Sequence, residues 1–215
     1  SDPAGDQSES QAAYRYPRNR FGEFSSVWNS TWYNVTGYWA KKLVALRSTF
    51  TGSDNVSFYS VAFPDMRYAD LLLMAAEAWN EAEETPNEKV YDYLDQVRER
   101  AGLEGIKETY AKYASVQYKD YPSHKSQMRD IIHRERQVEL SCEGSYYWDT
   151  RRWKTAEKEL NRIVQGWNVL NGETAEDYYI PTNIYNQQFT LRDYFAPIPD
   201  GDIIRNPQLV QNPWW

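Results

Sequence analysis

The sequence is poor in cysteine, in long apolar runs and in clustered positive charge. Cys142 is the only cysteine among 215 residues, which excludes an internal disulfide and a metal site built from several thiolates. No stretch approaches the ~18–20 consecutive apolar residues that a membrane-spanning helix needs. Residues 1–19 also lack the apolar segment of a signal peptide and are typical of a polar linker.

Basic residues are outnumbered by acidic ones, 24 to 31, and the formal net charge is −7. Binding to nucleic acid depends on neutralising phosphates with lysine and arginine, and this chain contains no basic run that could do so. We therefore expect no nucleic-acid partner. An anionic membrane surface is disfavoured for the same reason.

The motifs of several common sites are also missing. The only two histidines, His124 and His133, do not have the spacing of a metal-binding pair. Asp200-Gly201-Asp202 lacks the further oxygen ligands of a calcium loop. No GxSxG, Walker-type or GxGxxG sequence occurs, so we expect no catalytic site, no metal and no cofactor.

Aromatic residues are abundant: 9 Trp, 18 Tyr and 7 Phe make up 16% of the chain. Tyrosine and tryptophan bury a large apolar area while keeping one polar atom in contact with water. Such a composition suits a binding surface as well as a core. The distribution suggests a single domain with a disordered linker at 1–13, an aromatic-rich loop region at 14–63, which includes an extended piece near 38–46, and a helical region at 64–215.

Apolar spacing predicts a helical hairpin at the start of the helical region. The first helix, capped by Asp65, places one set of residues on its inner face: Tyr68, Leu71, Leu72, Ala75, Ala76 and Trp79. A capping box with proline at Thr85–Glu88 predicts the start of the second helix. That helix has an inner face of Val90, Leu94, Val97 and Ala101, and Gly102 suits its left-handed exit.

Two further helices are predicted after a Tyr-rich connector. The third runs from Ser126 to Cys142, ends at Gly144, and turns four residues inward: Met128, Ile131, Ile132 and Val138. The fourth covers 146–161, and we assign the aromatic residues of 146–153 to the core. Asn171-Gly172 suggests a turn or hairpin. The tail from Pro181 is expected to be irregular.

Four motifs resemble one family in their order and spacing. They are RYADLLLMAAEAWNE (67–81), VRERAGL (97–103), HRERQVELSCEGSYYWDTRRW (133–153) and YFAPIPDGDIIRNPQLVQNPWW (194–215). GYWAKKL (37–43) is similar to a short segment that precedes the first motif. On these residues the chain resembles the SusD/RagB family of outer-membrane glycan-capture lipoproteins, in its C-terminal portion.

The resemblance implies a mainly α fold, in which tetratricopeptide-like helical hairpins form a superhelix with long loops and minor β-hairpin content. It implies non-catalytic, cell-surface binding of a glycan or oligosaccharide. It also implies delivery to a SusC-like TonB-dependent outer-membrane transporter. Members of the family reach the membrane through a lipid anchor, which this chain does not contain. Two positions depart from the family pattern: Cys142 replaces a bulky apolar residue, and the chain ends in NPWW.

The segment HRERQVEL brings together four charged residues, Arg134, Glu135, Arg136 and Glu139. Glu135 and Glu139 are one helical turn apart and could be read as the carboxylate pair of a glycosidase, which flanks a bond in an open cleft. Neighbouring arginines would keep both carboxylates ionised, which does not suit a general acid. We therefore interpret the four residues as structural ion pairs.

The aromatic-rich region holds the predicted ligand site. Trp28 and Trp32 are spaced to share one side of a helical turn, and Asn29 and Tyr33 lie beside them. An indole or phenol ring can cover the apolar C–H face of a sugar, and asparagine can exchange hydrogen bonds with its hydroxyls. We assign glycan binding to Trp28, Asn29, Trp32 and Tyr33, and packing against the helices to Tyr38 and Trp39.

Two alternatives remain open at the level of sequence. A helical-repeat adaptor that binds a protein or peptide would share the predicted hairpins. A glycoside hydrolase would need a reacting pair of carboxylates that the sequence does not display.

Overall fold

The structure is a computed structural model that describes residues 19–23, 26, 34–40, 42–43, 45, 48–50, 56–57 and 59–215. The linker predicted at 1–13 and about half of the loop region predicted at 14–63 lie outside these residues. The chain divides into two compact units. We call Phe63–Asp149 the helical unit, and Ser1–Ala62 together with Thr150–Trp215 the hairpin unit.

Helix α2 (Tyr68–Ala82) buries part of the face that the sequence predicts, since Leu72 and Ala76 are buried and Trp79 packs against the core. Its buried residues are Ala69, Leu72, Leu73, Ala76 and Asn80. Tyr68 and Leu71, which were expected to be buried, are 69% and 51% exposed. The consecutive leucines 71–73 fit either helical phase, so apolar spacing does not fix the buried side. The cap predicted at Asp65 is wrong, because Arg67 is the N-cap residue.

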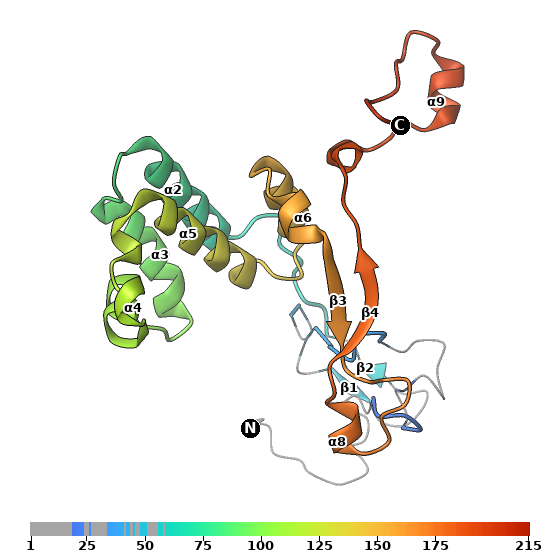
Figure 1. The fold of residues 1–215 in the computed structure, drawn as a ribbon, viewed down its shortest axis with the longest axis horizontal. Coiled ribbons are helices and arrows are strands. Elements are labelled where there is room, and N and C mark those ends of the chain that lie inside the picture. Colours follow the sequence, from blue (N-terminus) through green and yellow to red (C-terminus); the bar gives the residue numbers. More distant parts are fainter. Residues whose placement is uncertain are drawn as a thin grey trace. The chain divides into compact units, whose positions relative to one another are not determined.

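Helix α3 (Glu88–Arg100) follows α2 and completes the predicted helical hairpin (Figure 1). It begins after Asn87, whose side-chain oxygen accepts hydrogen bonds from the next two free amides. The capping box predicted at Thr85 therefore starts too early, because asparagine is itself a strong N-cap residue. Ala101 is exposed, and Gly102 leaves the helix with a φ of +77°. The residues buried as predicted are Val90, Leu94 and Val97.

The Tyr-rich connector is more helical than predicted. It contains α4 (Ile106–Tyr113) and two short 3-10 turns, η1 (Val116–Tyr118) and η2 (Tyr121–Ser123). The carboxylate of Asp95 on α3 accepts a hydrogen bond from the amide of Ile106 at 2.8 Å. A carboxylate from another helix thus satisfies a free amide at the start of α4. Such a cap leaves no local signal in the sequence.

Helix α5 (Lys125–Glu139) ends before the predicted boundary at Cys142. The chain then turns through Cys142 and Gly144, which have φ angles of +64° and +82°. Val138 is 61% exposed, so its predicted inward orientation is wrong. The residues of α5 that are buried as predicted are Met128, Ile131 and Ile132.

One aliphatic core joins α2, α3, α4 and α5, which gather in one part of Figure 1. Its most deeply buried members are Leu73, Val90, Leu94, Ile106, Met128 and Ile132. Each such side chain stabilises the fold by about 1.5–3 kcal/mol relative to an exposed position. The hydroxyl of Tyr91 also donates to the carbonyl of Pro122 at 2.9 Å, which ties α3 to η2.

The predicted fourth helix is divided in two. Helix α6 (Ser145–Arg152) and helix α7 (Ala156–Leu160) are separated by Lys154, whose φ is +56°. A left-handed residue cannot continue a right-handed helix. Tyr147 and Trp148 on α6 are 46% and 68% exposed, so their assignment to the core is wrong.

The hairpin unit is built around two antiparallel strands, β3 (Arg162–Gly166) and β4 (Thr182–Gln187). They pair from Arg162 opposite Gln187 to Gly166 opposite Thr182, with an irregularity next to Val164. The connection between them contains α8 (Ala175–Tyr178) and the turn predicted near Asn171 (Figure 1).

The remaining elements are short. Strands β1 (Thr49–Phe50) and β2 (Val56–Ser57) form a small antiparallel pair. The tail is more regular than predicted, because it contains β4, η3 (Leu191–Tyr194) and α9 (Asp200–Arg205). No helix within the described residues is long and apolar enough to cross a membrane. The predicted fold class, mainly α with minor β-hairpin content, is confirmed.

Candidate functional site

Three adjoining aromatic rings, two of them exposed, meet in the hairpin unit. We call Tyr38, Trp167 and Tyr179 the aromatic patch. The ring centroids of Tyr38 and Trp167 are 5.4 Å apart, and those of Trp167 and Tyr179 are 5.3 Å apart. Tyr38 and Tyr179 are 55% and 61% exposed, while Trp167 is partly buried between them. The chain thus presents adjoining aromatic surfaces to solvent.

Two glycines let the segments that carry these rings approach each other. The carbonyl of Thr36 accepts a hydrogen bond from the amide of Trp167 at 2.9 Å. A Cβ atom on Gly166 would lie 2.6 Å from that same carbonyl oxygen. A Cβ atom on Gly37, whose φ is +73°, would lie 2.5 Å from the hydroxyl of Tyr178. Side chains at either glycine would therefore push the two segments apart.

A turn centred on Asn34 fixes the loop that carries Tyr38. The Asn34 side-chain oxygen accepts hydrogen bonds from the amide and the hydroxyl of Thr36, at 2.9 and 2.8 Å. Its side-chain amide donates to the carbonyl of Tyr38. Asparagine is favoured in turns because its side chain can bond to the nearby backbone in this way. The side chain of Asn34 thus fixes the backbone of this loop by bonding to both Thr36 and Tyr38.

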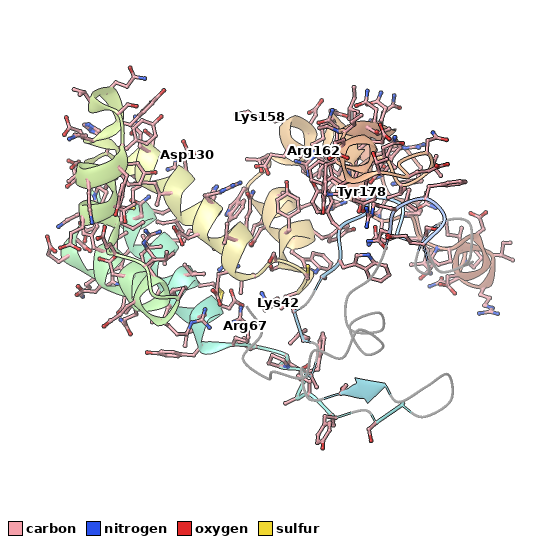
Figure 2. The ribbon with its side chains drawn as sticks, turned by 90° about the horizontal axis from the view of Figure 1, so that it is seen from below. Lys42, Arg67, Asp130, Lys158, Arg162 and Tyr178 are labelled. Carbon is pink, nitrogen blue, oxygen red and sulfur yellow. The ribbon has the colours of Figure 1, made fainter. Side chains whose placement is uncertain are left out.

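Tyr178, which is labelled in Figure 2, is buried and adjoins the patch through Tyr179. Its hydroxyl donates to the carbonyl of Gly37 at 3.4 Å, and its ring contacts that of Tyr179 at 5.1 Å. Burial raises the pKa of Tyr178, so this hydroxyl stays protonated and remains a donor at neutral pH. Val169, which is also buried, packs against Gly37 from the same segment.

The patch does not coincide with the site that the sequence predicts. Trp28, Asn29, Trp32 and Tyr33 lie outside the described residues, so their role in glycan binding stays a prediction. Tyr38 and Trp39 were expected to pack against the helices, but both are exposed, at 55% and 44%.

Sequence reasoning did not single out Trp167 or Tyr179. The only local signal was an aromatic residue directly after a β-strand, followed by a Tyr-Tyr pair after a turn. Neither pattern identifies a binding residue, because aromatic residues at such positions usually belong to the core.

The charged residues of α5 hold the helical unit together. Glu135 pairs with Arg98 on α3, and Arg98 also donates to the carbonyl of Glu104 and the hydroxyl of Thr109, both at 2.9 Å. Arg98 is 8% exposed, so its guanidinium has exchanged water for these three acceptors.

Glu139 bridges two arginines. It accepts from Arg67 at 2.7 Å and from Arg100 at 2.6 Å, and Arg67 also pairs with Glu143 at 2.8 Å. Figure 2 shows Arg67 at the start of α2. Hydrogen bonds to Glu143 and Glu139 raise the pKa of Arg67. Glu135 and Glu139, the two carboxylates that could be read as a glycosidase pair, thus both form ion pairs with arginines from other parts of the helical unit.

Arg136 is the most enclosed of the four residues. It is 4% exposed and donates two hydrogen bonds to Asp149, at 3.0 and 3.2 Å, and one to Asp70 at 2.9 Å. This arrangement connects α5 to α2 and α6. Arg134, in contrast, is exposed and forms no ion pair with any described residue.

The described residues contain no group of three or more histidine, cysteine or acidic side chains able to hold a metal ion. His124 precedes α5 and is exposed, whereas His133 lies within α5. Asp200 and Asp202 belong to the first turn of α9 and do not form a loop of converging oxygens.

Sequence comparison relates the chain to one family. The SusD family profile matches residues 5–215. Two curated relatives from Formosa agariphila are similar in sequence. SusD-like protein P2 is 31% identical over 71% of this chain and 26% of its own length, and SusD-like protein P38 is 32% identical over 68% and 23%. The chain thus spans about a quarter of the length of these relatives.

Solved structures agree with this relationship. The protein named BT4246 is 27% identical and superposes with a TM-score of 0.71, over 88% of this chain and 30% of that one. A SusD-like carbohydrate binding protein from Bacteroides fragilis has the same fold, with a TM-score of 0.55 and 24% identity over 74% of this chain and 31% of its own. By its sequence and its fold, the chain belongs to the SusD family.

Proposed function

We propose that this chain takes part in non-catalytic capture of a glycan at the cell surface and in its delivery to a SusC-like TonB-dependent outer-membrane transporter. In this proposal the full-length protein is held at the outer membrane by a lipid anchor. The observation that carries the binding function is the aromatic patch, an exposed set of adjoining rings in a member of the SusD family. The transporter and the anchor follow from family membership alone.

The chemistry of the patch suits a sugar. The faces of Tyr38 and Tyr179 can cover the C–H faces of pyranose rings without requiring charge. Asn168, whose amide nitrogen and side chain bond to the carbonyls of Tyr178 and Asp177, adds a polar rim next to Trp167. Aromatic faces with neighbouring amides are what an uncharged polyhydroxylated ligand requires.

Weak binding is expected. Taking about 0.5–1.5 kcal/mol for each ring by analogy with aromatic pairs, three rings contribute only a few kcal/mol. After the costs of ordering the ligand, the dissociation constant should lie roughly between micromolar and millimolar. Reversible capture before import is compatible with such affinity. Glu135 and Glu139 support a non-catalytic role, because both carboxylates are engaged in ion pairs with arginines of the helical unit.

Glycan retention by the full-length protein tests the proposal. Retention can be measured by affinity electrophoresis in gels that contain polysaccharides and on a glycan array. Replacing both Trp167 and Tyr179 by alanine should weaken binding roughly 5- to 150-fold, because two ring contacts are lost. Tyr185→Ala is the matched control, since Tyr185 is 55% exposed on β4 and lies outside the patch. Equal losses in both variants would contradict the assignment.

The predicted N-terminal residues need a separate test. Trp28→Ala combined with Trp32→Ala should abolish retention if they share the site, while the circular dichroism spectrum stays unchanged. Undiminished retention would refute that placement without affecting the patch. A helical adaptor for proteins predicts no array signal at all, and a glycoside hydrolase predicts shortened products after incubation with polysaccharides.

A further inference from the structure

We infer that the aromatic patch selects uncharged glycans and discriminates against glycans that carry carboxylate or sulfate groups. This inference rests on the proposed function and adds the class of ligand. The rings come from two segments, 34–40 and 167–180. Together these segments contain three carboxylates, Glu173, Glu176 and Asp177, and no basic residue.

The carboxylates lie next to the rings. Glu176 is exposed on α8 and precedes Tyr179 by three residues, so both lie on the same side of that turn. The carbonyl of Asp177 accepts a hydrogen bond from the side chain of Asn168, the residue after Trp167, at 3.3 Å. The Asp177 carboxylate itself accepts from the hydroxyl of Thr174 at 2.7 Å. The loop that carries two of the three rings is therefore bordered by negative charge.

Among the described residues of the hairpin unit, the basic side chains near these two segments, Arg20 and Lys42, already interact with other groups. Arg20 pairs with Glu23 at 3.1 Å, and Glu23 also acts on the pKa of Tyr178 as a nearby negative charge. Lys42 follows the 34–40 segment and takes part in an interaction of its own. Glu173 and Glu176 form no ion pair with any described basic residue.

Like charges close to a binding surface repel, and the repulsion acts over about 10 Å at 0.1 M salt. A uronate or sulfate placed on the patch would lie within that range of several carboxylates. Sugar hydroxyls, in contrast, can donate charge-assisted hydrogen bonds to exposed carboxylates. The same residues thus favour a neutral ligand and oppose an anionic one.

The test compares matched glycans on the full-length protein. We would measure retention on galactan and on polygalacturonate, and on mannan and on polymannuronate, by affinity electrophoresis at 20 and 300 mM NaCl. Each neutral glycan that binds should be retained about tenfold more strongly than its uronate at low salt, and the difference should shrink at high salt because screening weakens repulsion. Polyuronates retained as strongly as the neutral glycans would overturn the inference and leave the proposed function intact. Retention of none of the four would overturn the proposed function, and the inference with it.

A charge variant identifies the cause. Glu173→Gln with Glu176→Gln should raise retention of the polyuronate several-fold and slightly lower that of the neutral glycan, which loses its charge-assisted hydrogen bonds. Asp200→Asn with Asp202→Asn is the matched control, because it removes the same charge at α9, at the other end of the β3–β4 hairpin from α8 (Figure 1). Discrimination that is unchanged by the first variant, or changed equally by both, would contradict a local role for these carboxylates.

Discussion

The two units are stabilised in different ways. The helical unit has a closed aliphatic core and arginines whose charges are met by carboxylates from neighbouring helices. The hairpin unit relies on one long hairpin, on turns held by side-chain amides, and on aromatic rings that remain half exposed. The first arrangement favours stability, because the side chains of its core are removed from water. The second leaves apolar rings available to a ligand.

The comparison predicts that the largest losses of stability will come from the buried charges of the helical unit. Arg136→Ala should lower the free energy of unfolding by about 3–5 kcal/mol, because it removes the buried guanidinium that pairs with both Asp149 and Asp70. Urea unfolding followed by circular dichroism measures this. Arg129→Ala is the control: it breaks an exposed pair with Glu81 and should cost about 0–1 kcal/mol. Similar losses in the two variants would be inconsistent with a burial effect.

A smaller loss is expected at Glu139. Glu139→Ala removes the shared partner of Arg67 and Arg100 and should cost about 1.5–3 kcal/mol, the range of hydrogen bonds to charged groups. Glu88→Ala provides the comparison, because the Glu88 side chain is 80% exposed in its pair with Lys107 and should contribute little. Thermal unfolding unchanged by Glu139→Ala would count against the structural role of this residue.

In the hairpin unit, the close approach at Gly37 is the sensitive point. Gly37→Ala should cost about 1–2 kcal/mol for a left-handed alanine, and its Cβ would meet the hydroxyl of Tyr178. We expect weaker glycan retention and faster amide exchange in 34–40 and 167–180. Gly22→Ala has a similar φ, +86°, but nothing within 4 Å of its Cβ, so it should leave retention unchanged. Normal glycan retention by Gly37→Ala would show that the close approach of residue 37 to Tyr178 is not needed for binding.

The smallest expected change in stability concerns Val138 on α5, which the sequence predicts to be buried and the structure shows exposed. Val138→Ser should change stability by no more than about 0.5 kcal/mol, because this side chain is 61% exposed. Ile132→Val, on the buried face of α5, should cost about 0.5–1.5 kcal/mol although it removes only one methyl group. Urea unfolding of both variants checks the order, and a larger loss for Val138→Ser would support the inward orientation that the sequence predicts for Val138.

The helical unit could be predicted in large part from the sequence because its signals are local. Leu94 and Val97 recur at helical spacing, and Gly102 marks the exit of α3. The prediction fails where two helical phases fit the same apolar residues, as at the consecutive leucines of α2. It also fails where a residue distant in the sequence caps a helix. Asp95, which caps α4 from α3, is such a residue. The tetratricopeptide-like stacking of several hairpins stays a prediction.

The aromatic patch could not be predicted, because no segment contains enough of it to form a pattern. Tyr38 and Tyr179 are far apart in the sequence, and Trp167, which follows β3 directly, contacts both rings. What brings the rings together is the absence of side chains at Gly37 and Gly166. A glycine in the sequence does not by itself indicate which distant segment approaches it.

The bond between the hydroxyl of Tyr178 and the carbonyl of Gly37 joins residues that are 141 positions apart. A ribosome must therefore complete the entire helical unit before this bond can form, and contacts between such distant residues slow folding. The helical unit, whose contacts are complete at Asp149, can fold first during synthesis. The surface that we assign to the ligand would then mature only after the helical unit has formed.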